Sequence, residues 1–108
     1  MMLNHVRAVI TGGASGLGLA VAQHLVSHGG RVALFDINDE KAADALINLG
    51  TDNACYFKTD VSDEIQVAAN LASARDFLGG LNAVINCAGI LGAGRVLGRE
   101  ASMPLEQF

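Results

Sequence analysis

The sequence predicts an α/β fold with a doubly wound parallel sheet, because short apolar runs alternate with segments of helical period through most of the chain. Four runs have the length of buried strands, at residues 6–10, 31–36, 54–58 and 83–86. With 51% hydrophobic and 17% charged residues, the composition suits a sheet that helices cover on both faces. A length of 108 residues allows one modest domain, in which these strands take the order 3-2-1-4.

The first helix is expected to follow the glycine-rich segment 11–18 and to end at the glycine pair 29–30. Its apolar positions, Leu17, Val21 and Leu25, repeat at helical spacing and predict the face that packs on the sheet, with Ala20 beside them. The histidines of this helix, at positions 24 and 28, then face solvent.

The second and third helices carry signals at both ends. The second opens at Asn38, has acidic residues in its first turn and closes at Gly50. The third opens at Ser62, again with acidic residues following, and closes at the glycine pair 79–80.

Charge and cysteine content exclude several classes of partner. A net charge of −4 offers no basic surface, so we expect neither nucleic acid nor a membrane as a partner. No stretch reaches the length of a membrane span, and we expect a cytoplasmic protein, with the mitochondrial matrix as the alternative. Cys55 and Cys87 fall in predicted buried strands without CxxC spacing, which indicates reduced structural thiols, with Cys87 in the core, and no metal site.

The most informative segment is TGGASGLG at residues 11–18, directly after the first apolar run and directly before a helical segment. A pyrophosphate binds backbone N–H groups at a helix N-terminus, and glycine lets the backbone come close to it. Asp36 ends the second apolar run, 18 residues past Gly18, where a dinucleotide fold places its ribose-binding acid. Together these features predict a Rossmann-type nucleotide site.

Over residues 6–108 the motifs resemble, in order and spacing, the short-chain dehydrogenase/reductase family. Residues 11–18 match its TGxxxGxG pattern, and Asp36 matches its acid after the second strand. Asp60-Val61 matches its adenine-ring pair, and the segment 86–89 (NCAG) matches its NNAG. Segments 10–18 and 86–90 look most similar to type 2 3-hydroxyacyl-CoA dehydrogenases.

Chemistry and resemblance together give roles to the phosphate loop. Gly12 permits a tight turn, while Gly16 and Gly18 permit close backbone approach and helix packing. The N–H of Leu17 points at the pyrophosphate, and Ser15 can donate its hydroxyl.

The resemblance assigns the adenosine half to residues further along the chain. It implies that the Asp60 side chain and the Val61 N–H receive the adenine, and that residues near the fourth strand pack under the ribose. Those residues are Asn86, Ala88 and Gly89. Thr11 is expected to tie the first and fourth strands by a hydrogen bond to that segment. Because Ser15 and Ile37 stand where NADP-using relatives carry a basic residue, the expected cofactor is NAD.

Structural interpretations remain open beside these roles. The glycine-rich turn can exist without a ligand, and Asp36 can be a turn residue or a cap before Asn38. Asp60 can belong to the exit of a strand into a capped helix, and Asn86 can satisfy backbone groups at a strand end. Asn82 replaces the Asp that the family usually has before its fourth strand, which weakens a helix-end charge contact.

The family's catalytic Ser and YxxxK pair come after the fourth strand, and neither occurs in this sequence. The single tyrosine, Tyr56, has Asp60 four residues later, so no catalytic residue is assigned. We therefore expect residues 1–108 to be the NAD-binding Rossmann portion of one short-chain dehydrogenase domain, inactive alone. The parent protein would be an oligomer that interconverts a secondary alcohol and a ketone, possible substrates including 3-hydroxyacyl-CoA.

Two other functions stay open at this point. One is a non-catalytic nucleotide-binding or interaction module. The other is an S-adenosylmethionine methyltransferase, against which the match at residues 86–89 argues. The fourth strand is predicted at the sheet edge despite its apolar content, so residues 1–108 alone are expected to associate or aggregate.

Overall fold

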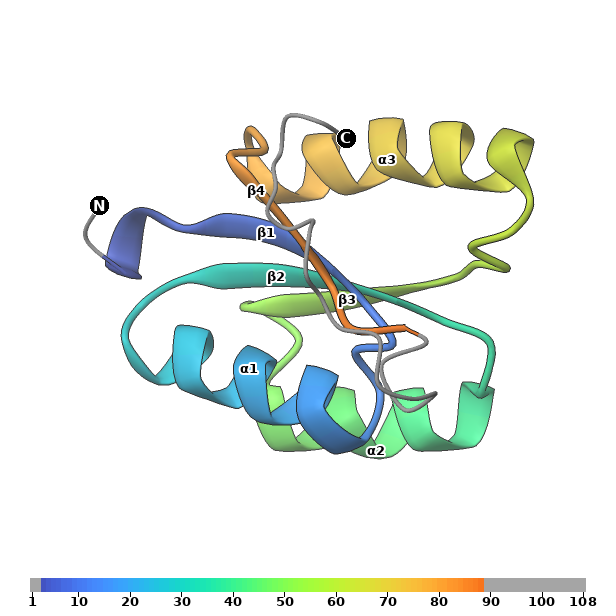
Figure 1. Cartoon of the computed structure of the whole chain (residues 1–108). Coiled ribbons are helices and arrows are strands. Elements are labelled where there is room, and N and C mark those ends of the chain that lie inside the picture. Colours follow the sequence, from blue (N-terminus) through green and yellow to red (C-terminus); the bar gives the residue numbers. More distant parts are fainter. Residues whose placement is uncertain (1–2, 89–108) are drawn as a thin grey trace.

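Parallel strands joined by helical crossovers build the domain (Figure 1). The computed structural model describes residues 3–88. Its strands are β1 (Arg7–Thr11), β2 (Arg31–Asp36), β3 (Ala54–Lys58) and β4 (Ala83–Asn86). They form one four-stranded sheet in the order β3-β2-β1-β4, with every neighbouring pair parallel. The predicted fold class and strand order are confirmed.

The start of β1 differs by one residue from the predicted strand 6–10. The N–H of Val6 donates to the Leu3 carbonyl at 3.1 Å and so follows a short 3-10 helix, η1 (Leu3–His5). The parallel ladder therefore begins at Arg7, and it extends to Thr11, which pairs with both neighbouring strands.

Helices cover both faces of the sheet. Helices α1 (Gly16–Ser27) and α2 (Asp39–Leu49) lie on one face, and α3 (Glu64–Leu78) lies on the other (Figure 1). Alternate residues of the strands point to opposite faces and so form two separate cores. The α1/α2 core is built on Ala8, Ile10, Val32 and Leu34, and the α3 core on Val9, Ala33 and Phe35.

The face by which helix α1 packs only partly matches the predicted one, because Leu25 is buried and Val21 packs against the core but Leu17 does not. Its buried residues are Gly18, Ala22 and Leu25, whereas the Leu17 side chain is 55% exposed. Ala20 is also exposed and Val21 is half-buried. The small residues Gly18 and Ala22 let the helix approach the glycine-rich turn closely, and that approach rotates Leu17 away from the sheet.

The predicted caps of α2 are present, and one cap of α3 is corrected. Asn38 caps α2 by accepting a hydrogen bond from the Lys41 N–H at 2.9 Å, and the helix ends at Gly50. The N-cap of α3 is Asp63 rather than Ser62, because Ser62 is bound to Asp60 instead.

The edge position of β4 is as expected, and Val84 on it is 45% exposed. Both cysteines are free, but they are only half-buried, so, contrary to expectation, Cys87 does not lie within the core. Cys55 and Cys87 pack beside the two cores without entering them. Within residues 3–88, the structure has no helix with the length and apolar character of a membrane span.

Candidate functional site

The carboxyl ends of the strands meet along one edge of the sheet, at the right of Figure 1. The chain runs from β1 outward to β2 and β3 and then returns to β4 on the other side of β1. Such a reversal is where open parallel sheets bind ligands. The predicted site residues described by the structure lie at these strand ends, in the following loops or in the first turn of α1. They are Gly12, Ser15, Gly16, Leu17, Gly18, Asp36, Asp60, Val61, Asn86 and Ala88. Gly89 lies outside the described residues.

Two glycines of the loop are required by close contacts. Gly12 has φ +68°, and a Cβ there would lie 3.0 Å from the backbone nitrogen of Ala88. A Cβ on Gly18 would collide with the carbonyl oxygen of Gly12. These contacts pack the loop against the segment after β4 and bring α1 close to the sheet.

Gly16 has a different environment at the start of α1. Its φ is +58°, and among the described residues no atom lies within 4 Å of the position that a Cβ would take. The neighbouring N-cap, Ser15, is extended, and its side chain makes no capping hydrogen bond. The loop therefore presents backbone to open space at the helix N-terminus.

The three helices differ in how their N-termini are satisfied. Asn38 and Asp63 cap α2 and α3 with their side chains, and both helices have acidic residues in the first turn. Within the described helix α1, the first turn holds no acidic residue and the N-cap side chain accepts no bond. The N–H groups of a first helical turn have no intrahelical acceptors, so these groups and the positive end of the α1 dipole suit an external anion.

Thr11 joins the glycine-rich loop to the end of β4, as expected. Its hydroxyl donates to Asn86 Oδ1 at 2.7 Å and accepts from the N–H groups of Cys87 at 3.0 Å and Ala88 at 3.2 Å. One donor and two lone pairs are the full capacity of a hydroxyl. The Thr11 side chain thus joins the glycine-rich loop to the segment after β4, and these two loops lie on either side of the reversal in strand order.

Asp36 connects the end of β2 to the same loop. Its Oδ2 accepts from the Ala14 N–H at 3.0 Å, and its Oδ1 accepts from the N–H groups of Ile37 at 2.7 Å and Asn38 at 3.3 Å. The bonds to Ile37 and Asn38 are those of a turn residue, whereas the bond to Ala14 spans two loops. Oδ2 accepts only this one bond among the described residues, so its second lone pair can also accept from a ribose hydroxyl.

Asp60 has local partners beyond the end of β3. Its Oδ1 accepts from both the N–H and the hydroxyl of Ser62, at 2.9 and 2.6 Å. These bonds, the hydroxyl's above all, hold the pKa of Asp60 below its usual value. The arrangement is the one expected for the exit of a strand into a capped helix, and Val61 beside it is 45% exposed.

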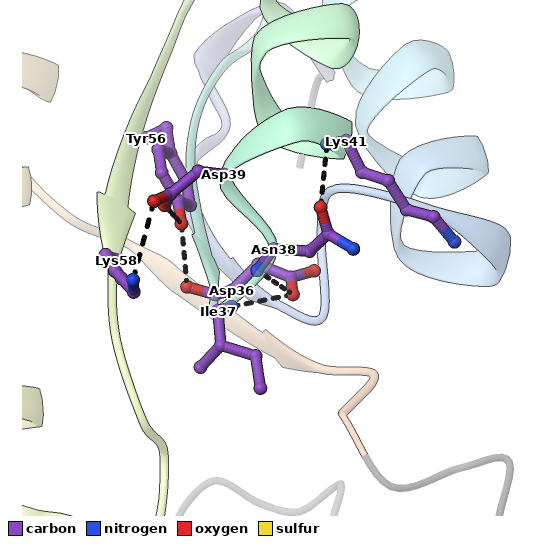
Figure 2. A network of polar contacts seen from close by, with 7 residues as sticks. All are labelled: Asp36, Ile37, Asn38, Asp39, Lys41, Tyr56 and Lys58. Atoms are coloured by element: carbon purple, nitrogen blue, oxygen red, sulfur yellow. Dashed lines mark hydrogen bonds and ion pairs between the residues drawn. The ribbon is translucent and has the colours of Figure 1, made fainter.

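A polar network that the sequence did not predict lies beside Asp36 and is formed by Tyr56, Asp39 and Lys58 (Figure 2). The phenol hydroxyl lies 2.6 Å from Asp39 Oδ1, and Lys58 Nζ lies 3.4 Å from Asp39 Oδ2. A signal was present, because Tyr56 and Lys58 are two residues apart on one strand and so share a face.

Asn82, which stands where the family usually has Asp, makes two hydrogen bonds to the backbone around the start of β1. Its Oδ1 accepts from the Arg7 N–H at 2.8 Å, and its Nδ2 donates to the His5 carbonyl at 2.7 Å. The side chain therefore ties the loop before β4 to the start of β1 rather than making a charge contact with a helix end.

Comparison with known proteins agrees with this geometry. The family model described as short chain dehydrogenase matches residues 6–107. The chain belongs to the short-chain dehydrogenase family. The resemblance seen in the sequence is thereby confirmed.

Relatives within the short-chain dehydrogenase family differ in the compounds for which they are named. Momilactone A synthase of Oryza sativa subsp. japonica is 45% identical over 79% of this chain and 31% of its own length. The 3-hydroxyacyl-CoA dehydrogenase type-2 of Bos taurus is 39% identical over 94% of this chain and 39% of its own. The chain therefore spans about a third of the length of these relatives.

The fold is also shared with solved structures. A short-chain dehydrogenase from Bacillus anthracis superimposes with a TM-score of 0.75 over 82% of this chain and 36% of that one. At 22% sequence identity, this likeness concerns the fold.

Proposed function

We propose that this chain binds NAD(H) at the carboxyl edge of its sheet and supplies the cofactor-binding portion of a short-chain dehydrogenase. The observation that carries the proposal is the N-terminus of α1, where the N-cap side chain makes no capping hydrogen bond and, among the described residues, the space beside Gly16 is open. A dinucleotide pyrophosphate has the charge and size for such a site.

The phosphate loop would hold the pyrophosphate through its backbone. Gly12 and Gly18 keep the turn tight, Gly16 leaves the approach open, and the Leu17 N–H would donate to a phosphate oxygen. Ser15 would add its hydroxyl, since its side chain is not used for capping.

The adenosine would lie across the ends of β2 and β3. Asp36 would accept from the ribose hydroxyls, and Asp60 and Val61 would receive the adenine. Ile37 and Val61 support this placement, because they follow adjacent strands and expose 64% and 45% of their apolar side chains. Residues at and after the end of β4 would pack under the ribose, namely Asn86, Ala88 and Gly89.

The charge of Asp36 is our reason for proposing NAD rather than NADP. A carboxylate about 4 Å from a 2′-phosphate repels it by roughly 1–4 kcal/mol, depending on the local dielectric. No basic residue stands at Ser15 or Ile37 to offset this repulsion. The nearby Lys58 is paired with Asp39 at 3.4 Å.

The reaction proposed for the parent protein is the interconversion of a secondary alcohol and a ketone. When bound, the nicotinamide would accept or supply the hydride. The proton would be handled by the family's Ser and Tyr–Lys pair, none of which is recognisable in residues 1–108. We therefore propose that these residues bind cofactor but do not turn over substrate alone. Among substrates, 3-hydroxyacyl-CoA is the first to test, because one relative is named for it.

Assembly and location are also proposals. We propose an oligomeric parent protein in a reducing compartment such as the cytoplasm, and the two free cysteines support that compartment.

Calorimetric titration of the protein containing residues 1–108 tests the proposal. NAD(H) is expected to bind, NADP(H) at least tenfold more weakly, and S-adenosylmethionine not at all. Equal affinity for the two dinucleotides would contradict the NAD assignment. Binding of S-adenosylmethionine alone would contradict the proposed cofactor class.

A further inference from the structure

We infer that Tyr56 is a positioning residue, which fixes Asp36 against the cofactor ribose and so sharpens the preference for NAD over NADP. This inference rests on the proposed cofactor site. It adds a residue on a neighbouring strand that acts through Asp36.

The Tyr56 hydroxyl lies between the two ends of the turn that carries Asp36 (Figure 2). It is 3.2 Å from the backbone carbonyl oxygen of Asp36 and 2.6 Å from Asp39 Oδ1. The Asp36 carbonyl also accepts from the Thr59 N–H at 2.9 Å. The phenol has a single proton, which it donates mainly to Asp39, the nearer acceptor. The turn is therefore held to β3 by Tyr56 at Asp39, and to the residue after β3 by the Thr59 N–H at the Asp36 carbonyl.

Asp39 is a fixed anchor for the phenol. It is the first residue of α2, where a carboxylate is stabilised by the helix dipole, and Lys58 Nζ lies 3.4 Å from it. The hydrogen bond from Tyr56 is the main cause of a lowered pKa at Asp39. Burial, with the Asp39 carboxylate next, raises the pKa of Tyr56, so the phenol keeps its proton and donates.

The Asp36 side chain reaches from this turn to the glycine-rich loop. Its carboxylate accepts from Ala14 on the far side of the site and from Ile37 and Asn38 within the turn. A shift of the turn therefore moves the carboxylate relative to the loop that would hold the pyrophosphate. Because repulsion between charges depends on their separation, a looser Asp36 excludes a 2′-phosphate less well and binds a ribose less well.

Tyr56→Phe in the protein containing residues 1–108 tests this inference, because it removes the hydroxyl and keeps the ring and the charge. We expect the Kd for NADH to rise about three- to tenfold, as for the loss of one positioning hydrogen bond. We expect the Kd for NADPH to change less, so that the ratio of the Kd for NADPH to the Kd for NADH falls. The KM for NAD should rise while kcat is unchanged.

Asn48→Ala is the control, because it also removes a side-chain hydrogen bond that holds α2, but one that does not involve the turn at Asp36. Asn48 Oδ1 accepts from Gln23 Nε2 at 2.9 Å, toward the other end of the same helix and away from Asp36. We expect it to leave the NADPH-to-NADH ratio of Kd values within twofold of the parent protein.

A second pair of variants tests the hydrogen bond between Tyr56 and Asp39 by changing Asp39 instead of Tyr56. Asp39→Ala removes the acceptor of the phenol and should lower the ratio, whereas Asp44→Ala removes an exposed charge of the same helix and should not. An unchanged ratio in Tyr56→Phe, or an equal fall in Asn48→Ala, would overturn the role of Tyr56 and leave the cofactor site standing. Absence of dinucleotide binding in the parent protein would overturn both.

Discussion

The hydroxyl of Thr11 lies 2.7 Å from Asn86 Oδ1, so the ends of β1 and β4 are joined by a side-chain hydrogen bond. These strands flank the point where the order of the sheet reverses. The same hydroxyl accepts from the two backbone N–H groups that follow Asn86. The Thr11 hydroxyl therefore fixes the position of the glycine-rich loop relative to the NCAG segment.

Thr11→Val should destabilise the protein by about 0.5–1.5 kcal/mol, because the isosteric methyl group leaves the Ala88 N–H and the Asn86 amide without their partner. Urea unfolding measures the change. Thr51→Val is the control, since Thr51 is exposed in the turn after α2, and its effect should stay within about 0.5 kcal/mol. Equal effects of the two substitutions would show that the Thr11 hydroxyl stabilises nothing.

Asp36→Asn should weaken the preference for NAD over NADP by about tenfold or more, because it removes the charge that repels a 2′-phosphate. The amide keeps an oxygen that can accept from Ile37 and Asn38, so the turn is retained. The measurement is the ratio of the Kd values for NADPH and NADH. Asp44→Asn, an exposed charge on α2, is the control. A preference that survives Asp36→Asn contradicts the assignment of this residue.

Cys55 should make the protein less stable at alkaline pH. Burial raises the pKa of its thiol from 9.0 to about 11, with the Arg31 charge opposing this. Between these values the unfolded chain has already lost the proton that the folded chain retains, so stability falls as pH rises. Urea unfolding at about pH 8 and about pH 10.5 should show this fall, and Cys55→Ala should reduce it. If the variant keeps the full alkaline loss, other groups cause it.

The same burial should make Cys55 slow to react with thiol reagents at neutral pH, since the thiolate is the reactive form. Modification that is as fast as for free cysteine would contradict the raised pKa.

Most element boundaries could be predicted because they depend on local signals, and the strand order because alternating strands and helices predict a doubly wound sheet. Apolar runs mark the strands, and glycines and capping residues mark the helix ends. The cap of α3 was misplaced by one residue because Ser62 and Asp63 can both cap, and only the contact between Asp60 and Ser62 decides between them.

Tertiary contacts explain the remaining differences. The buried face of α1 follows from the contact of Gly18 with Gly12, which overrides the apolar periodicity that includes Leu17. The network around Tyr56 depends on the register of β2 against β3, which pairs Asp36 with Lys58. Sequence periodicity places residues on a face but does not set that register.

Comparison of Gly16→Ala with Gly79→Ala is the most direct test of the proposed pyrophosphate site at the start of α1. Both glycines have positive φ, +58° and +75°, and among the described residues neither has an atom within 4 Å of its Cβ position. Alanine should therefore cost similar stability at both sites, about 1 kcal/mol. Only Gly16→Ala puts a methyl group at the open N-terminus of α1.

In fluorescence titrations with NADH, Gly16→Ala should raise the Kd at least tenfold, and Gly79→Ala should leave it within twofold of the parent protein. Unchanged NADH binding in Gly16→Ala, or an equal loss in both variants, would contradict a pyrophosphate site at the start of α1.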